Sequence, residues 1–331
     1  MSAPAFDVIT VGDSAVDTFI KIHEASIECD IHHEECKICV RYGDKIPVEA
    51  IGHGVAGNAA NVATGCAKLG LKTAIYTNLG DDDIAKTIKA NFIANNVSDT
   101  YIVSNKNKES NLSVILNFQG ERTAFVYHQP WFYKLPKMEA AKFLYFTSLS
   151  ESFTSSNIVD EACKYIDASG AKLVYSPGTF QIKADVKRFP RILEKSDIFV
   201  VNVEEAKKIL NIDMKEEVQV KELLSKIHLL GPKTVVITDG AEGSYASDGK
   251  RNLRLGVFPV QVYEKTGAGD AYTSALICAL SYGLDLSEAM VWGALNSASC
   301  IQKLGPQNGL LSRAEIERNR MVVRDLVAVK F

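Results

Sequence analysis

Short apolar runs alternate with amphipathic segments along most of the chain. The apolar runs are rich in β-branched and aromatic residues, which favours strands, and they include FDVITVG, TAIYTNLG, KFLYFTS, KLVYSPG, DIFVVN and KTVVITDG. Between them lie segments with apolar residues at helical spacing, such as SSNIVDEACKYIDAS and VQVKELLSKIHLL. Apolar strands separated by helices predict an α/β fold in three layers, with a largely parallel central sheet covered by helices on both faces.

Two segments with glycines at their ends stand out in this pattern. Residues 57–69 have small and apolar residues at helical spacing, and Gly70 follows as an expected C-cap. Residues 260–265, VQVYEK, alternate like a strand and lead into GAGD, after which an apolar-periodic segment predicts a long helix. GAGD is therefore expected at a strand-to-helix joint.

Two stretches interrupt the alternation of strands and helices. Residues 18–51 and 100–128 contain alternating polar and apolar runs such as NLSVILNF and ERTAFVYH, with turn signals and no intervening helix. We expect them to form a small antiparallel β lid inserted at two points. A length of 331 residues fits one large domain or two ordinary ones, but no linker or repeat divides the chain, so residues 1–331 are predicted to form a single domain.

The composition excludes several classes of protein. Hydrophobic residues make up 47% of the chain and charged residues 23%, and the net charge of −3 argues against a nucleic-acid-binding surface. No apolar run approaches the roughly 20 residues needed to span a bilayer, so no membrane association is expected. The first residues, MSAPAFDVITVGD, lack the basic and apolar regions of a signal peptide, which predicts a cytoplasmic protein.

Seven scattered cysteines are expected to be free and mostly buried thiols, not a disulfide framework. A zinc site is the alternative for Cys29, His32, Cys36 and Cys39, because they form two pairs with two intervening residues each. The segment is acidic and only three residues separate the pairs, so a partly buried lid strand is the preferred interpretation.

The GAGD motif permits two interpretations of Asp270. Glycines at the start of a helix allow close approach of a ligand, and the unpaired amides of the first turn attract anions. Asp270 could simply favour the helix start, a role worth about 0.5–2 kcal/mol, or it could act as a general base beside a bound phosphoryl group. A GxxxxGK[ST] loop is absent, and GDSAVD after the first strand is not a GxGxxG dinucleotide fingerprint.

Further motifs, taken together, identify the chain as similar to a known family. EKTGAGD at 264–270, AGNAANVATGCAKLG at 56–70 and VGDSAVD at 11–17 occur with NVEEA at 202–206, VVITDGAEGSYASDG at 235–249 and QKLGPQNGLLS at 302–312. Their sequence and order resemble those of the ribokinase-like (PfkB-type) carbohydrate and nucleoside kinases. The resemblance covers nearly the whole chain and implies a ribokinase-like domain with a β lid.

The resemblance implies a role for each matching residue. Asp270 would take the proton from the acceptor hydroxyl, and the amides of Gly267, Ala268 and Gly269 would hold the γ-phosphoryl group of ATP. The expected binding residues are Asp17, Gly57 and Asn61 for the acceptor, Asn202 and Glu205 for Mg²⁺ and its waters, and Asn202, Thr238, Gly240, Gly243 and Asn296 for the nucleotide. A non-catalytic relative would be expected to lack Asp270 or Glu205, and both are present.

Two residues depart from the family pattern. Glu264 stands where the family usually has aspartate and Lys265 where it often has threonine, next to a monovalent-cation site in several members. They put a dependence on potassium in doubt. The motifs also contain no basic anchor for a phosphorylated acceptor, which favours a neutral sugar or a nucleoside.

These observations predict an ATP- and Mg²⁺-dependent kinase that phosphorylates a primary hydroxyl of a sugar. An adenosine-type nucleoside kinase is the alternative. We also expect a homodimer that pairs through residues 18–51 and 100–128, with Cys29, Cys36 and Cys39 near the interface.

Overall fold

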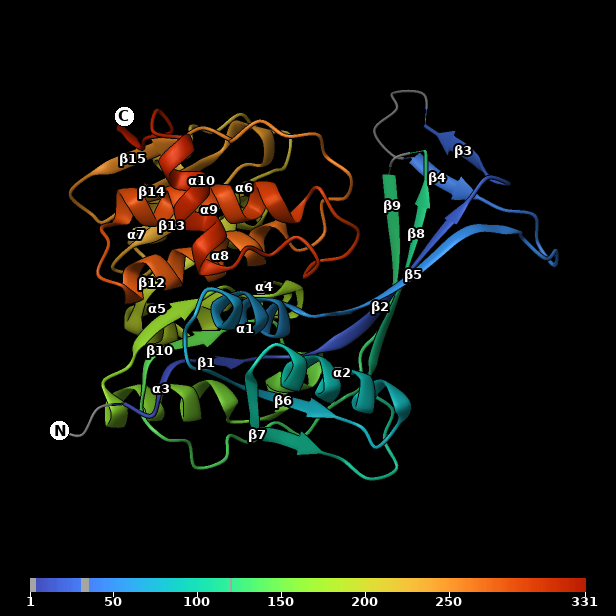
Figure 1. Ribbon diagram of the computed structural model, residues 1–331, viewed down its shortest axis with the longest axis horizontal. Coiled ribbons are helices and arrows are strands. Elements are labelled where there is room, and N and C mark those ends of the chain that lie inside the picture. The colour runs from blue at the N-terminus through green and yellow to red at the C-terminus, as the bar shows by residue number, and fades with distance from the viewer. Residues whose placement is uncertain (1–3, 31–35, 120) are drawn as a thin grey trace.

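The computed structural model describes residues 4–30, 36–119 and 121–331 (Figure 1). Within them the main sheet has ten strands in the order β16-β15-β14-β13-β12-β11-β10-β1-β6-β7. Pairing is parallel from β7 to β13 and antiparallel from β13 to β16. The strands are β1 Phe6–Val11, β6 Thr73–Leu79, β7 Val97–Ser104, β10 Ala141–Phe146, β11 Lys172–Tyr175, β12 Ser196–Asn202, β13 Val235–Thr238, β14 Ser244–Ser247, β15 Asn252–Leu255 and β16 Val329–Lys330.

Helices cover both faces of this sheet. One face packs against α1 Asn58–Lys68, α2 Asp83–Ala94, α8 Ala268–Ser281, α9 Leu286–Cys300 and α10 Arg313–Val322. The other packs against α3 Ile158–Ser169, α5 Pro190–Lys195, α6 Val203–Leu210 and α7 Val220–His228, near the short α4 Thr179–Lys183. The predicted three-layer fold is therefore confirmed, as is the helix expected over residues 57–69. In the described ranges, no helix has both the length and the apolar character needed to cross a membrane.

The lid is a second sheet that projects from one side of the body (Figure 1). Its order is β5-β2-β8-β9, from β2 Ala15–Ile22, β5 Val48–Ala56, β8 Asn111–Phe118 and β9 Glu121–Tyr127. Pairing is antiparallel within β2/β5 and within β8/β9, and parallel where β2 meets β8. The two inserted segments each supply two neighbouring strands of this sheet, and the parallel contact joins them.

Two predicted strand ranges need correction. Residues 100–104 belong to β7 of the main sheet, which pairs with β6 and not with the lid. β7 lies at the edge of the sheet and buries only some of its residues, so its sequence alternates as a lid strand would. Residues 260–265 form no strand: the amides of Tyr263 and Glu264 both donate to the carbonyl of Ile301.

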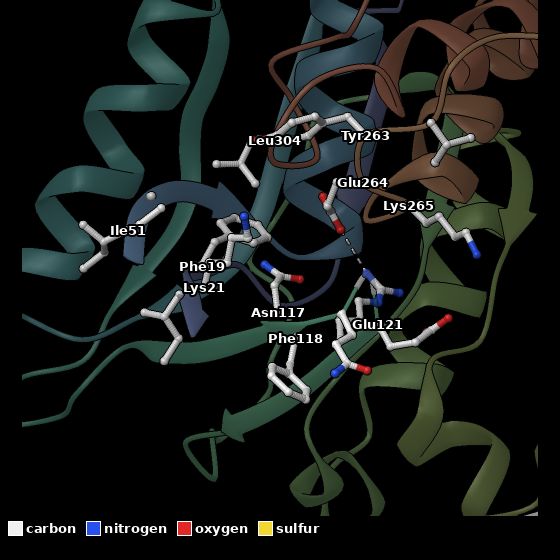
Figure 2. A pocket seen from close by; sticks show the side chains of 16 residues that line it. Phe19, Lys21, Ile51, Asn117, Phe118, Glu121, Tyr263, Glu264, Lys265 and Leu304 are labelled. Carbon is white, nitrogen blue, oxygen red and sulfur yellow. Dashed lines mark hydrogen bonds and ion pairs between the residues drawn. The ribbon is translucent and has the colours of Figure 1, made fainter. Parts of the chain in front are cut away.

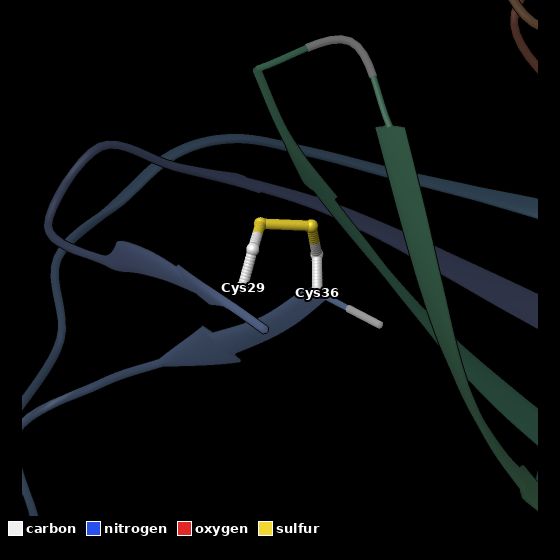
Figure 3. Close-up of a disulfide and its surroundings, with 2 residues drawn as sticks. All are labelled: Cys29 and Cys36. Atoms are coloured by element: carbon white, nitrogen blue, oxygen red, sulfur yellow. A yellow bond between two sulfur atoms is a disulfide. The ribbon is translucent and has the colours of Figure 1, made fainter. Parts of the chain in front are cut away.

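A disulfide joins Cys29 and Cys36 in the small hairpin of β3 Ser26–Cys29 and β4 Cys36–Cys39 (Figure 3). The antiparallel register places these two residues opposite each other. The expectation of free thiols is therefore wrong for this pair, although it is confirmed for Cys39 and for the buried Cys66, Cys163, Cys278 and Cys300.

The disulfide also argues against the alternative of a zinc site at Cys29, His32, Cys36 and Cys39. Cys29 and Cys36 bond to each other, so their sulfurs are no longer thiolate ligands. His32 lies outside the described residues, and among those that are described no group of three or more histidine, cysteine, aspartate or glutamate side chains is arranged to hold a metal ion.

Candidate active site

The GAGD turn starts helix α8 in a conformation that requires glycine. Gly267 is the N-cap with φ of 78°, and a Cβ there would lie 2.4 Å from Cβ of Pro306. The amide of Ala271 donates to the Gly267 carbonyl at 2.8 Å, while the Ala268 amide makes a long contact of 3.4 Å to the Lys265 carbonyl. The predicted anion hole of Gly267, Ala268 and Gly269 therefore lies at a helix N-terminus, with the Ala268 amide weakly engaged within the turn.

Asp270 follows in the first turn of α8 and is held by Asn61 of α1. The Asn61 Nδ2 group donates to Asp270 Oδ2 at 2.8 Å, and Gln307 Nε2 donates to Asn61 Oδ1 at 3.1 Å. Burial raises the pKa of Asp270 to about 6, and hydrogen bonds from Asn61 and Asn58 partly oppose this rise. Asp270 is thus ionised at neutral pH yet basic enough to accept a proton.

Of the residues expected to bind the acceptor, Gly57 and Asn61 lie at the start of α1, and Asp17 lies on β2 opposite Gly54 of β5. Asp17 is buried on β2, where burial raises its pKa to about 6, a hydrogen bond from Ser113 lowers it, and the nearby charge of Glu264 raises it. Gly57 is the N-cap of α1, with φ of 100° and no room for a Cβ, which would approach the Asp13 carbonyl oxygen to 2.5 Å. Both ends of the Asn61 amide bind protein groups in this structure, and its contact with the acceptor stays a prediction.

The predicted Mg²⁺ and nucleotide residues sit at the carboxyl ends of adjacent parallel strands. Asn202 ends β12 directly opposite Thr238 at the end of β13. Asn202 Oδ1 accepts from the Glu205 amide at 2.8 Å, and Glu205 Oε2 accepts from the Asn202 amide at 2.9 Å, which forms a capping box. Burial raises the pKa of Glu205, as does the charge of Asp270, so the two carboxylates share one electrostatic environment.

The glycines of the nucleotide motif turn the chain after β13. Gly240 has φ of 49° and Gly243 has φ of 97°, and a Cβ on Gly243 would lie 2.0 Å from the Leu255 carbonyl oxygen. These glycines therefore form the turn between β13 and β14 beside Thr238.

Asn296 does not fit its predicted role beside the nucleotide. It is fully buried in α9, donates to the Ala271 carbonyl at 2.8 Å and to Ser274 Oγ at 3.2 Å, and accepts from the Leu311 amide at 2.9 Å. Its amide instead ties α9 to α8 and to the segment after residue 310. A polar residue on a buried helix has the same sequence signature whether its partner is a ligand or another helix.

A cavity of about 420 Å³ lies between the inner side of the lid and residues 262–265 (Figure 2). Phe19, Gly52 and Leu304 supply part of its wall, and Arg122 of β9 reaches across it to Glu264. Sequence reasoning missed Arg122, Asn58 and Gln307. QKLGPQNGLLS gave a signal for Gln307 and AGNAAN for Asn58, but Arg122 becomes visible only once the register of β8 and β9 is known.

A three-layer α/β body, a β lid beside the ends of its central strands and an aspartate at a glycine-rich helix start define the ribokinase-like small-molecule kinases. The chain belongs to the pfkB family of carbohydrate kinases, which it matches over residues 18–313. It is therefore a sugar or nucleoside kinase of this family.

Individual comparisons agree with this assignment. The chain is 27% identical to the ribokinase of Haemophilus influenzae over 264 residues, which is 78% of this chain and 85% of that protein. Its fold is similar to that of Arabidopsis thaliana ribokinase complexed with ribose and ATP, with a TM-score of 0.78, 21% identity and coverage of 96% and 98% of the two chains. It is also similar to Methanocaldococcus jannaschii nucleoside kinase, with a TM-score of 0.76, 16% identity and the same coverage.

Proposed function

We propose that this protein transfers the γ-phosphoryl group of ATP to a primary hydroxyl of a sugar, with Asp270 as the general base. The observation that carries the proposal is the placement of Asp270: a carboxylate with a pKa of about 6, oriented by Asn61, at the amide-rich start of α8. Phosphoryl transfer demands positioning and charge stabilisation more than covalent chemistry, and this arrangement offers both.

Some residues of the site would bind the acceptor, and others would bind the phosphoryl group. Asp17 would accept hydrogen bonds from the acceptor hydroxyls, while Asp270 would receive the proton of the attacking hydroxyl. The glycine turn before Asp270 would orient backbone amides toward the phosphoryl oxygens. Phe19, Gly52 and Leu304 would help to exclude water, which competes with the acceptor.

Glu205 and Asn202 fit a role in holding Mg²⁺ through water. Their side chains offer the oxygen ligands that Mg²⁺ prefers, and only one Glu205 oxygen is used in the capping box. A nearby dication would also offset the mutual repulsion of Glu205 and Asp270 that raises the pKa of Glu205. When bound, the metal would neutralise charge on the ATP phosphates. A relative of the same fold from Escherichia coli, a putative ribokinase II, is described in complex with ATP and Mg²⁺.

A nucleoside kinase is the second candidate, because the fold matches that of a nucleoside kinase nearly as well as that of a ribokinase. Measuring ADP formation with a panel of sugars and nucleosides separates the two. We expect turnover with a sugar. Turnover with nucleosides alone would establish the alternative.

Replacement of Asp270 by asparagine tests the catalytic role. Asparagine retains an oxygen that can accept from Asn61 but cannot take up the proton, so we expect kcat to fall about 10²–10⁴-fold while ATP binding, measured by calorimetry, changes little.

Asp83→Asn is the matched control for Asp270→Asn, because Asp83 also lies in the first turn of a helix but is exposed. It should leave turnover unchanged. If Asp270→Asn retains a tenth or more of the activity, Asp270 only favours the helix start and the base assignment is wrong.

A further inference from the structure

The carboxylate of Glu264 is buried at the edge of the proposed site with one oxygen unsatisfied. Its side chain is 7% exposed, and Oε1 accepts from the Thr266 amide at 2.8 Å. Within the part of the chain that the structure describes, Oε2 is buried and has no hydrogen-bond partner. A buried carboxylate needs a compensating cation, so this group requires a positive charge from elsewhere.

Arg122 brings that charge from the lid. Its Nη1 atom lies 3.4 Å from Glu264 Oε1, the contact that the dashed line at Glu264 marks in Figure 2. The same atom also donates to the hydroxyl of Thr266. The ion pair is longer than the 2.7–2.9 Å typical of a charge-assisted hydrogen bond. The structure therefore shows a single, long ion-pair contact through Oε1, and among the described residues Oε2 of Glu264 stays without a partner.

The contact with Arg122 also explains why residue 264 departs from the family pattern. Glutamate has one more methylene than the aspartate usual at this position, and its extra reach extends the carboxylate toward the lid. The guanidinium already beside it would repel a second cation, so the site does not suit a monovalent ion while Arg122 is in place.

We propose that Arg122 and Glu264 form a latch between lid and body, and that Arg122 replaces a monovalent cation at this position. Thr266, the other partner of Arg122, directly precedes Gly267. Closing the latch therefore orders the turn that presents the anion-binding amides. The effect of the latch on phosphoryl transfer rests on the proposed function. The contact between Arg122 and Glu264 does not, and neither does the replacement of a monovalent cation by Arg122.

Hydrogen exchange of the ligand-free protein tests the latch. We expect Arg122→Gln and Glu264→Gln each to speed amide exchange about tenfold or more in β8, β9 and residues 262–267, and the double variant to add little. Lys265→Gln removes a neighbouring positive charge in the same cavity and should leave exchange unchanged. Unchanged exchange in Arg122→Gln, or additive effects in the double variant, would overturn the latch.

Thermal unfolding in KCl and in choline chloride at equal ionic strength tests the replacement of the cation. The Tm of the wild-type protein should agree in the two salts within about 1 °C, and that of Arg122→Gln should be higher in KCl, where an ion can take the vacated place. A potassium-specific rise of about 3 °C or more in the wild type, or none in Arg122→Gln, would contradict the proposal. Neither experiment needs a substrate, so an absence of kinase turnover would refute only the proposed function.

Discussion

Asn61 binds Asp270 through an amide whose two ends both have protein partners. Gln307 fixes its oxygen, so its nitrogen must point to the carboxylate. A hydrogen bond donated to the ionised form lowers the pKa of an acid, and Asn61 therefore keeps the pKa of Asp270 from rising further above about 6. In the proposed function, Asn61 would therefore orient the base and limit the rise of its pKa.

Asn61→Leu should shift the acidic limb of the pH profile to higher pH. The base must be deprotonated to act, so kcat/KM of the wild type should rise through about pH 6 and level off above it. Without the donor, the pKa of Asp270 rises. The loss of activity should then be largest near pH 6 and shrink toward pH 9, as measured by steady-state kinetics across this range.

Thr64→Val is the control for Asn61→Leu, because Thr64 is buried on the same helix and is not among the partners of Asp270. Its profile should keep the wild-type limb. A uniform loss of activity in Asn61→Leu at every pH would show that Asn61 contributes to packing or to acceptor binding only.

At the scale of single residues, the sequence predicted those residues whose backbone conformation is set by a local turn. Gly267, Gly243 and Gly57 each have a positive φ, which favours glycine and belongs to a local turn that a short motif records. Arg122 was missed, and the contacts of Asn296 with α8 and with Leu311 were not foreseen, because each depends on which distant segment lies opposite. That information resides in strand register and helix packing, not in spacing along the chain.

The start of α1 offers a comparison of two glycines in one segment. Gly57 adopts φ of 100° and has the Asp13 carbonyl oxygen 2.5 Å from where a Cβ would lie, whereas Gly54 has nothing within 4 Å. We expect Gly57→Ala to lower the free energy of unfolding by about 1–3 kcal/mol, and Gly54→Ala to change it by about 0.5 kcal/mol or less, in urea titrations. Equal effects of the two substitutions would show that the turn at residue 57 relaxes to accept a side chain.

Helices and strands with a strong hydrophobic period were predicted correctly. Segments whose structure depends on the strand that pairs with them were not. The alternation in residues 97–104 reflects an edge position in the main sheet, and the alternation in 260–265 occurs in a segment that pairs with no strand. In both cases a period of two was present, but the partner strand decides whether it becomes a lid, an edge or a loop. The disulfide likewise depends on the register that places Cys29 opposite Cys36.

At the scale of the whole molecule, the repeated strand–helix units determined the three layers. Each apolar strand must be covered on both faces, so the body followed from the sequence pattern. The sequence pattern did not predict how the two inserted segments join in the lid. They join through the parallel pairing of β2 with β8, which lie almost a hundred residues apart in the chain. The latch between Arg122 and Glu264 depends on that joining.

The lid also leaves apolar surface uncovered, which predicts association of two chains. Strand β9 is an edge of the lid sheet, all its residues are exposed, and it carries Phe125, Val126 and Tyr127 at 60%, 58% and 44% exposure. An exposed apolar edge strand invites pairing or aggregation unless a partner covers it. We therefore expect light scattering to give twice the chain mass of 36.2 kDa at micromolar concentration.

Phe125→Lys should shift this protein toward the monomer, because it places a charge in the middle of the apolar strand. Phe132→Lys is the matched control: Phe132 is 77% exposed but lies outside the lid strands, so its replacement should leave the mass unchanged. A monomeric wild type would refute the association. A dimer that both variants retain would locate the interface on another surface, and the apolar residues of β9 would then need a different explanation.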